Sequence, residues 1–267
     1  MAINFTFGLG HLLASGGHDA TLSSPTQKAN LGDIIYLRDK LGSRYLKYNR
    51  SVATAAMAQG KITAKFGDAN GLTAITNILS GSTIHAVTSG LTAGTFEGGL
   101  CYVRDVNAVA GAAPEGEVAI VKQNSTTRID FDDKYPLSAA LAVNDDLTIE
   151  ARNTVILSAS GDNVNRVSGA IVAESVAVAD YFWTQFSGLC RVVTEATIAP
   201  LVGAQAMCAA TTAGAVDGVG ASTAFVDVIG YFRFAIATND IVNDFGWINI
   251  ACDEASSLVL STLDATA

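Results

Sequence analysis

The sequence has few charged residues, which make up 15% of its 267 positions, against about 25% in typical soluble domains. A monomer needs charge to keep its surface soluble. The shortage therefore favours a protein that buries part of its surface against neighbours, and a weakly charged monomer is the alternative. The formal net charge is -9, and Lys and Arg form no cluster. Direct nucleic-acid binding is not expected, because contact with a phosphate backbone needs such clusters.

Long hydrophobic runs are also lacking. No apolar stretch reaches the roughly 18 uncharged residues of a membrane span. The first residues, "MAINFTFGLGHLLASGGHD", lack the positively charged segment with which a signal peptide begins. We therefore expect no membrane partner, and we expect synthesis in the cytoplasm.

Cysteine and histidine are too few and too scattered for the common metal and disulfide motifs. Four cysteines are present without a CxxC spacing, and the three histidines lie far from them in the sequence. The chain is too long for so few cysteines to form a disulfide framework. We predict that they are small apolar core residues. They are Cys101, Cys190, Cys208 and Cys252.

Enzyme and cofactor motifs are missing as well. The sequence has no GxSxG, no HExxH and no GxxxxGK[ST]. A triad of His85 with an aspartate and a serine stays open, although a lone strand histidine is more often structural. Paired acids such as Asp132 with Asp146 or Glu150 are a further option that the spacing does not select. The acidic stretches "DFDDK" (130–134) and "NDD" are typical of turns. We expect no enzyme, no metal and no cofactor.

The residues that are abundant predict a β structure. Short β-branched or apolar runs alternate with polar residues and are separated by Gly, Asn, Asp and Thr about every ten positions. We predict an all-β fold, a β-sandwich or jelly-roll-like β-barrel, with few short helices near 52–60 and 136–143 and an irregular N-terminal arm. The predicted organisation is an arm (1–30), a β-rich domain (31–156) and a β-rich C-terminal region (157–267). The last two are either separate or packed into one composite domain.

Aromatic residues gather in three stretches, "YFWTQFSGLC" (181–190), "GYFRFAIA" (230–237) and "DFGWINIAC" (244–252). We interpret them mainly as cross-strand pairs that fill a β core, with Trp183 packed inward on a central strand. Alternation places Tyr231 and Arg233 on the face opposite Phe232. Exposed members would anchor an interface. The candidate interface residues are Phe5, Phe7, His11, Tyr181, Tyr231 and Arg233.

The order of several segments resembles a family of tailed-bacteriophage virion proteins that are encoded by head genes and associated with the capsid. The segments are "LGSRYLKYNRSVATAAMAQGKI", "FEGGLCYVRD…EGEVAIVKQNSTTRIDFDDKYPLSAALAVNDDLTIEARNTVI" and "DYFWTQFSGLCRVVTEATIAPLVGAQAMCAATTAGAVDG", and they lie between about residues 40 and 250. The resemblance implies a non-enzymatic decoration or cement protein on the capsid exterior. It also implies binding to the major capsid protein and to itself, with a homotrimer expected at junctions between capsomers.

Two other functions remain as alternatives. One is a carbohydrate-binding or depolymerising virion module that uses exposed aromatics, with Trp183 and Tyr231 as the stacking residues. The other is the major capsid protein itself, which is disfavoured because the sequence predicts no long helix. Each alternative differs from a cement protein in what it binds and in its copy number per virion.

Overall fold

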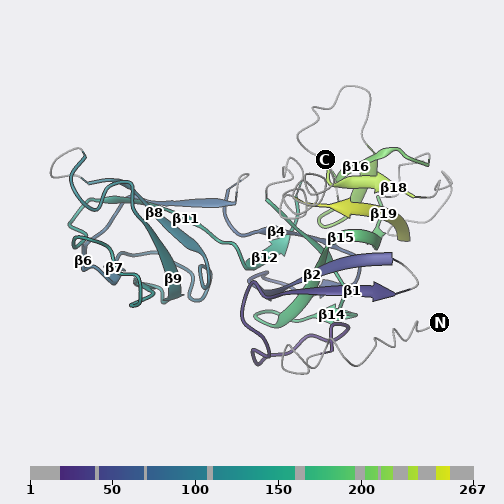
Figure 1. The fold of residues 1–267 in the computed structure, drawn as a ribbon, viewed down its shortest axis with the longest axis horizontal. Helices are drawn as coiled ribbons and strands as arrows, with labels where there is room; N and C mark the ends of the chain where they lie inside the picture. Colours follow the sequence, from purple (N-terminus) through teal and green to yellow (C-terminus); the bar gives the residue numbers. More distant parts are fainter. Residues whose placement is uncertain are drawn as a thin grey trace, which may run out of the picture. The chain divides into compact units, whose positions relative to one another are not determined.

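Strands joined by turns, bends and irregular segments make up the described part of the chain, and this confirms the all-β prediction (Figure 1). The computed structural model describes residues 19–39, 42–68, 71–106, 111–159, 166–195, 202–209, 212–218, 228–233 and 245–252. None of these residues is in a helix, and none belongs to a helix that could span a membrane.

The helices expected near 52–60 and 136–143 are therefore wrong. The first segment contains the short strand β3 (Met57–Ala58), which pairs with β14 (Ser175–Val176). The second is irregular. Neither sequence has an apolar helical face long enough to stabilise a helix by packing, so distant partners decide the local conformation.

The chain divides into two compact units, and the second is inserted within the first. Unit 1 comprises Met1–Ala64 and Ile156–Ala267, and unit 2 comprises Lys65–Val155. The boundary expected between 156 and 157 lies next to the point where the chain returns to unit 1. Residues 31–64, expected in the first β-rich domain, instead belong with the C-terminal region. The part of the expected arm that is described, residues 19–30, contributes Ala20 to a buried cluster of unit 1.

Unit 1 is built on one ten-stranded sheet that closes on itself. Strand β2 is hydrogen-bonded to β12 and also to β15, so β2, β12, β4, β13 and β15 form a ring. Strand β1 extends the sheet beyond β2 as a terminal strand. The bounds are β1 (Ile34–Asp39), β2 (Gly42–Ser51), β4 (Ile62–Lys65), β12 (Thr154–Leu157), β13 (Val167–Ile171) and β15 (Tyr181–Val193).

The second half of β15 belongs to another ring in the same unit. Its further members, in sheet order, are β19 (Phe245–Ala251), β18 (Gly230–Phe232), β16 (Gln205–Cys208) and β17 (Val216–Gly218). A bridge between Thr194 and Val216 joins β17 back to the end of β15. Alternating residues of these strands point inward and form one buried cluster. It includes Cys190, Val192, Ala206, Cys208, Val216, Phe232, Ile248 and Ile250.

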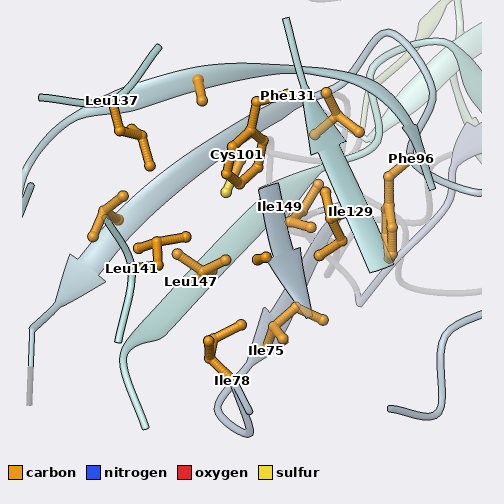
Figure 2. Close-up of a cluster of buried hydrophobic side chains, with 14 of the residues drawn as sticks. Ile75, Ile78, Phe96, Cys101, Ile129, Phe131, Leu137, Leu141, Leu147 and Ile149 are labelled. Atoms are coloured by element: carbon orange, nitrogen blue, oxygen red, sulfur yellow. The ribbon is translucent and has the colours of Figure 1, made fainter. Parts of the chain in front are cut away.

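Unit 2 has a seven-stranded sheet in the order β5-β11-β8-β9-β10-β7-β6. The bounds are β5 (Leu72–Ile75), β6 (Ser80–Gly81), β7 (His85–Val87), β8 (Leu100–Asp105), β9 (Val118–Asn124), β10 (Arg128–Phe131) and β11 (Asp146–Glu150). Its core is separate from those of unit 1. In this core, aliphatic side chains pack around Phe131, Phe96 and Cys101 (Figure 2). All of the buried residues of the cluster lie between Ile75 and Ala151.

The stretch 181–190 forms the first ten residues of β15, and the prediction of a central strand is confirmed. Trp183 is fully buried, as expected, and its ring centroid lies 4.9 Å from that of Tyr48 on β2. Burial on both faces at Phe182–Phe186 explains why this part of the sequence does not alternate.

Candidate functional site

An exposed face rich in aromatic and arginine side chains covers the outside of the second ring in unit 1. On β19 the residues alternate, with Ile248 and Ile250 in the core and Trp247 and Asn249 on the outer face. On β18 the same alternation buries Phe232 and leaves Tyr231 and Arg233 outside. We call this surface the β19 face. Its members are Leu189, Arg191, Gln205, Tyr231, Arg233, Phe245, Trp247 and Asn249.

The strand register places these residues in two transverse rows. In the first, Asn249 lies opposite Leu189 on one side and Tyr231 on the other, and Tyr231 lies opposite Gln205. The second row contains Arg191, Trp247 and Arg233. Arg191 lies opposite Trp247, and the backbone N–H of Arg233 donates to the Trp247 carbonyl at 2.8 Å. The half-buried Trp247 is therefore flanked by an arginine on each neighbouring strand.

The two arginines are held differently. The Arg191 guanidinium lies 3.3 Å from the centroid of the Phe245 ring, a cation–π contact that fixes its position. Arg233 is exposed, and no carboxylate of the described residues pairs with it. Within the described part of the chain, Arg233 thus presents a positive charge beside Trp247 that no acid neutralises, in a protein that is acidic as a whole.

Two carboxylates of this ring lie on and near β17. Asp217 is opposite Met207 of β16. Burial raises the pKa of Asp217, the Gly218 N–H lowers it, and the nearby Glu195 carboxylate raises it further. The hydroxyl of Thr212 donates to Glu195 at 3.4 Å. Asp217 is half-buried on β17, whereas Glu195 is buried.

The predicted interface residues fall into three groups. Tyr231, 51% exposed, and Arg233 lie together on the β19 face. Tyr181 is at the start of β15 and is half-buried, stacked on Tyr48 with ring centroids 6.2 Å apart and the Arg50 guanidinium 5.6 Å from its own centroid. Its ring already has partners in unit 1. Phe5, Phe7 and His11 lie outside the described residues.

A serine, a histidine and an aspartate do come together in unit 2. Ser82 Oγ lies 2.8 Å from Nδ1 of His85, and His85 is opposite Asp130 in the register of β7 and β10. Ser82 Oγ also accepts from the Ile84 N–H at 3.1 Å, within the same turn. The Asp130 carboxylate accepts from Gln123 and Arg128. The serine is thus held as a turn residue, and neither oxygen of Asp130 has a hydrogen bond to His85 among those found in this part of the structure.

Two of the three carboxylates considered as acid pairs, Glu150 and Asp132, have other hydrogen-bond partners. Glu150 accepts from Lys65 at 3.0 Å and from the Tyr102 hydroxyl at 3.1 Å. Burial opposes ionisation of Glu150, but Lys65 beside it, with help from Arg152 and Tyr102, lowers the pKa of Glu150. Asp132 accepts the Lys134 N–H in a turn. Glu150 is therefore an ionised structural partner of Lys65.

The cysteines are free and buried, and their predicted place in the cores is confirmed. Burial raises the pKa of the Cys101 thiol to about 12, and burial likewise raises that of Cys190 to about 12 although Arg44 lowers it. Such thiols are not nucleophilic near neutral pH. Among the described residues, no group of three His, Cys, Asp or Glu is placed to hold a metal ion.

The β19 face was only partly foreseen. Sequence reasoning placed Tyr231 and Arg233 on one strand face but grouped Trp247 with the core aromatics. The alternation in "FGWINIA" (245–251) carries the signal that Trp247 shares a face with Asn249. Its position between two arginines depends on the pairing of β19 with β18 and with β15, and β15 is far from both in the sequence. No protein-family model, curated protein or solved structure matches this chain.

Proposed function

We propose that this chain is a non-enzymatic structural protein of a phage virion that decorates and cements the capsid exterior, using the β19 face as a binding surface. The observation that carries the proposal is Trp247 flanked by Arg191 and Arg233, with Tyr231 nearby. Trp, Tyr and Arg are the residues most enriched among those that dominate binding energy in protein interfaces. Arg191 is fixed by Phe245, so it loses little side-chain freedom on binding.

Composition supports the same proposal. A chain with 15% charged residues gains from covering its surface with neighbours. The proposed partners are the major capsid protein and further copies of the chain, in a homotrimer, without nucleic acid or membrane. Repetition by capsid symmetry gives avidity even when each contact is weak. The proposed location is the virion surface after synthesis in the host cytoplasm.

Quantitative mass spectrometry of purified virions tests the location and copy number. We expect hundreds of copies per particle, in simple ratio to the major capsid protein. A few copies per particle would contradict a cement role and favour a tail or minor head component.

Binding of the purified protein to capsids that lack it tests the surface. Trp247→Ala and Tyr231→Ala should each weaken binding at least tenfold. Tyr135→Ala is the matched control, because Tyr135 is a tyrosine of similar exposure in unit 2 (56% against 51%). If all three variants bind like the original protein, the β19 face is not the binding surface.

A carbohydrate-binding role is the second candidate. It is favoured by the row in which the Tyr231 ring lies between the amide side chains of Gln205 and Asn249, since sugars are bound by aromatic stacking with nearby amides. Trp183 is fully buried and cannot stack on a sugar, so Tyr231 and Trp247 take its place in this hypothesis. Binding to a host-polysaccharide panel that Tyr231→Ala abolishes would favour this role, and absence of binding would remove it.

A further inference from the structure

The outer edge of β1 is open in the described structure. Strand β1 is the terminal strand of its sheet and pairs only with β2 among the described strands. The Tyr48 N–H donates to the Asp33 carbonyl at 2.9 Å, so the backbone groups of Asp33 and of every second residue after it point towards β2. The bonding groups of Ile35 and Leu37 then face β2, and the N–H and C=O groups of three residues point away from it. These residues are Ile34, Tyr36 and Arg38.

The first part of this edge lacks the features that usually prevent pairing with another chain, whereas Arg38 and Asp39 place charges at its end. Natural edge strands carry proline, bulges or several charges. β1 has no proline, and its register with β2 is continuous over all six residues. Ile34 is 48% exposed and Tyr36 is 39% exposed, while Ile35 and Leu37 pack in the core. Two of the three residues with free backbone groups, Ile34 and Tyr36, therefore also present apolar side chains, and the third is Arg38.

Tyr36 is already ordered for such a contact. Its hydroxyl lies 2.8 Å from Ser43 Oγ, and its ring centroid lies 5.1 Å from that of Tyr45 on β2. Tyr45 in turn lies 6.1 Å from Phe186 of β15. An aromatic row thus runs from the open edge to the core, so Tyr36 would lose little conformational entropy when a strand is added beside it.

We propose that β1 pairs antiparallel with β1 of a second copy of this chain, with Ile34 of each copy opposite Tyr36 of the other. The N–H and C=O groups of both residues point outward, so Ile34 of one copy and Tyr36 of the other exchange two backbone hydrogen bonds. Two apolar–aromatic cross-strand pairs form, each of a type that contributes about 0.2–1 kcal/mol.

Charge disfavours one alternative register, and the loss of apolar pairs disfavours another. If Tyr36 lay opposite Tyr36 of the second copy, Asp33 would lie opposite Asp39, and like charges directly opposite each other destabilise a sheet. If Tyr36 lay opposite Arg38, Tyr36 would face a charged residue and both apolar pairs would be lost. The proposed register places Asp33 opposite Leu37. The contact is two-fold and isologous.

The contact does not depend on the proposed function and uses no residue of the β19 face. A two-fold contact at β1 joins two monomers into a dimer. If the chain forms trimers through other surfaces, the same contact joins two trimers. In both cases blocking the edge halves the mass of the assembly.

Sedimentation equilibrium of the full chain tests the pairing. Ile34→Lys places a charge on the edge and should halve the mass at tens of micromolar protein. Val118→Lys is the matched control, since Val118 has nearly the same exposure (51%) on β9 of unit 2. Tyr36→Pro is a second edge variant, because it removes an N–H that points away from β2 and so leaves the β1–β2 ladder intact. Equal masses for the original chain and both edge variants, with unchanged circular dichroism, would overturn the proposal.

Disulfide trapping tests the register. The native cysteines are buried, so mild oxidation acts on introduced thiols. Opposed residues of a hydrogen-bonded pair have Cα atoms about 5.5 Å apart, which a disulfide spans. Copies with Ile34→Cys mixed with copies with Tyr36→Cys should cross-link, and Tyr36→Cys alone should not. Rapid cross-linking of Tyr36→Cys alone would overturn the register and support the one with Tyr36 opposite itself.

Discussion

Unit 2 contains a largely buried ion pair and an exposed ion pair, which can be compared directly. The Lys65–Glu150 pair is largely buried, with 9% and 17% of the side chains exposed. The Lys122–Asp133 pair, at 3.6 Å, is mostly exposed. Solvent screens an exposed pair, whereas removal of one member of a buried pair leaves the other without compensation. The two pairs therefore contribute very differently to stability.

Glu150→Gln should destabilise unit 2 by about 1–3 kcal/mol at pH 7, because Lys65 loses a charged acceptor. The pKa of Glu150 in the folded protein lies below its ordinary value of 4.5. Its contribution is therefore fully present above pH 4.5 and is lost as the pH falls through the folded-state pKa. Urea unfolding at several pH values should show the difference between the two proteins shrinking towards acid. Asp133→Asn, the exposed control, should change little, and an equal loss in both variants would contradict this account.

The two tryptophans should report on different environments. Trp183 is fully buried between β2 and β15, and Trp247 is half-buried on the β19 face. Trp247→Phe should leave blue-shifted fluorescence that acrylamide quenches weakly. Trp183→Phe should leave emission that acrylamide quenches several-fold more strongly. Equal quenching of the two variants would contradict the placement of Trp247 on an exposed face.

At the scale of elements, the close approach of β2 to β15 depends on Gly188. Its φ is +92°, and a Cβ there would lie 2.4 Å from the Ser43 carbonyl oxygen. Gly188→Ala should therefore cost about 2–4 kcal/mol, combining left-handed strain with overpacking against backbone. Chemical denaturation of unit 1 measures this cost.

Gly42 provides a control with almost the same backbone angle. Its φ is +95°, and a Cβ at this position would have no other atom within 4 Å. Gly42→Ala should show only the strain, about 1–2 kcal/mol. A loss for Gly188→Ala no larger than that for Gly42→Ala would mean that β2 can move away from β15 at little cost.

The elements that sequence predicted well are those with a clear period. In "TRIDFD" (127–132) the alternation of apolar and polar residues puts Ile129 and Phe131 on one face, and both are buried. Near 52–60 the prediction of a helix failed, because the strand β3 is fixed by pairing with β14, more than a hundred residues later in the chain. The closure of the two rings in unit 1 likewise depends on pairing between strands that are distant in the sequence. The alternation of a strand states which residues share a face but does not identify the neighbouring strand, so the row of Arg191, Trp247 and Arg233 required the structure.

At the scale of the whole chain, the insertion of unit 2 could not be read from the sequence. Composition changes little at Ala64 or at Ile156, and no linker-like segment marks the first crossing. The crossings lie within β4 and β12, two strands that are hydrogen-bonded neighbours. The residue pattern of a strand does not change where the chain crosses from one unit to the other. The pattern alone therefore favoured a domain boundary at the Ser- and Gly-rich stretch that follows residue 156.

The closeness of β4 and β12 predicts that unit 2 folds without unit 1. Residues 65–155 contain every member of the Ile75–Ala151 core cluster, and their two ends lie on the paired strands β4 and β12. A fragment of residues 65–155 should show a β-type circular dichroism spectrum and a single cooperative urea transition. Glu150→Gln should lower the midpoint of this transition as it does in the full chain. A fragment of residues 65–150 is the control: it lacks Ala151, a member of the core cluster, so its midpoint should be lower. If the longer fragment shows no cooperative transition, the core of unit 2 depends on contacts with unit 1.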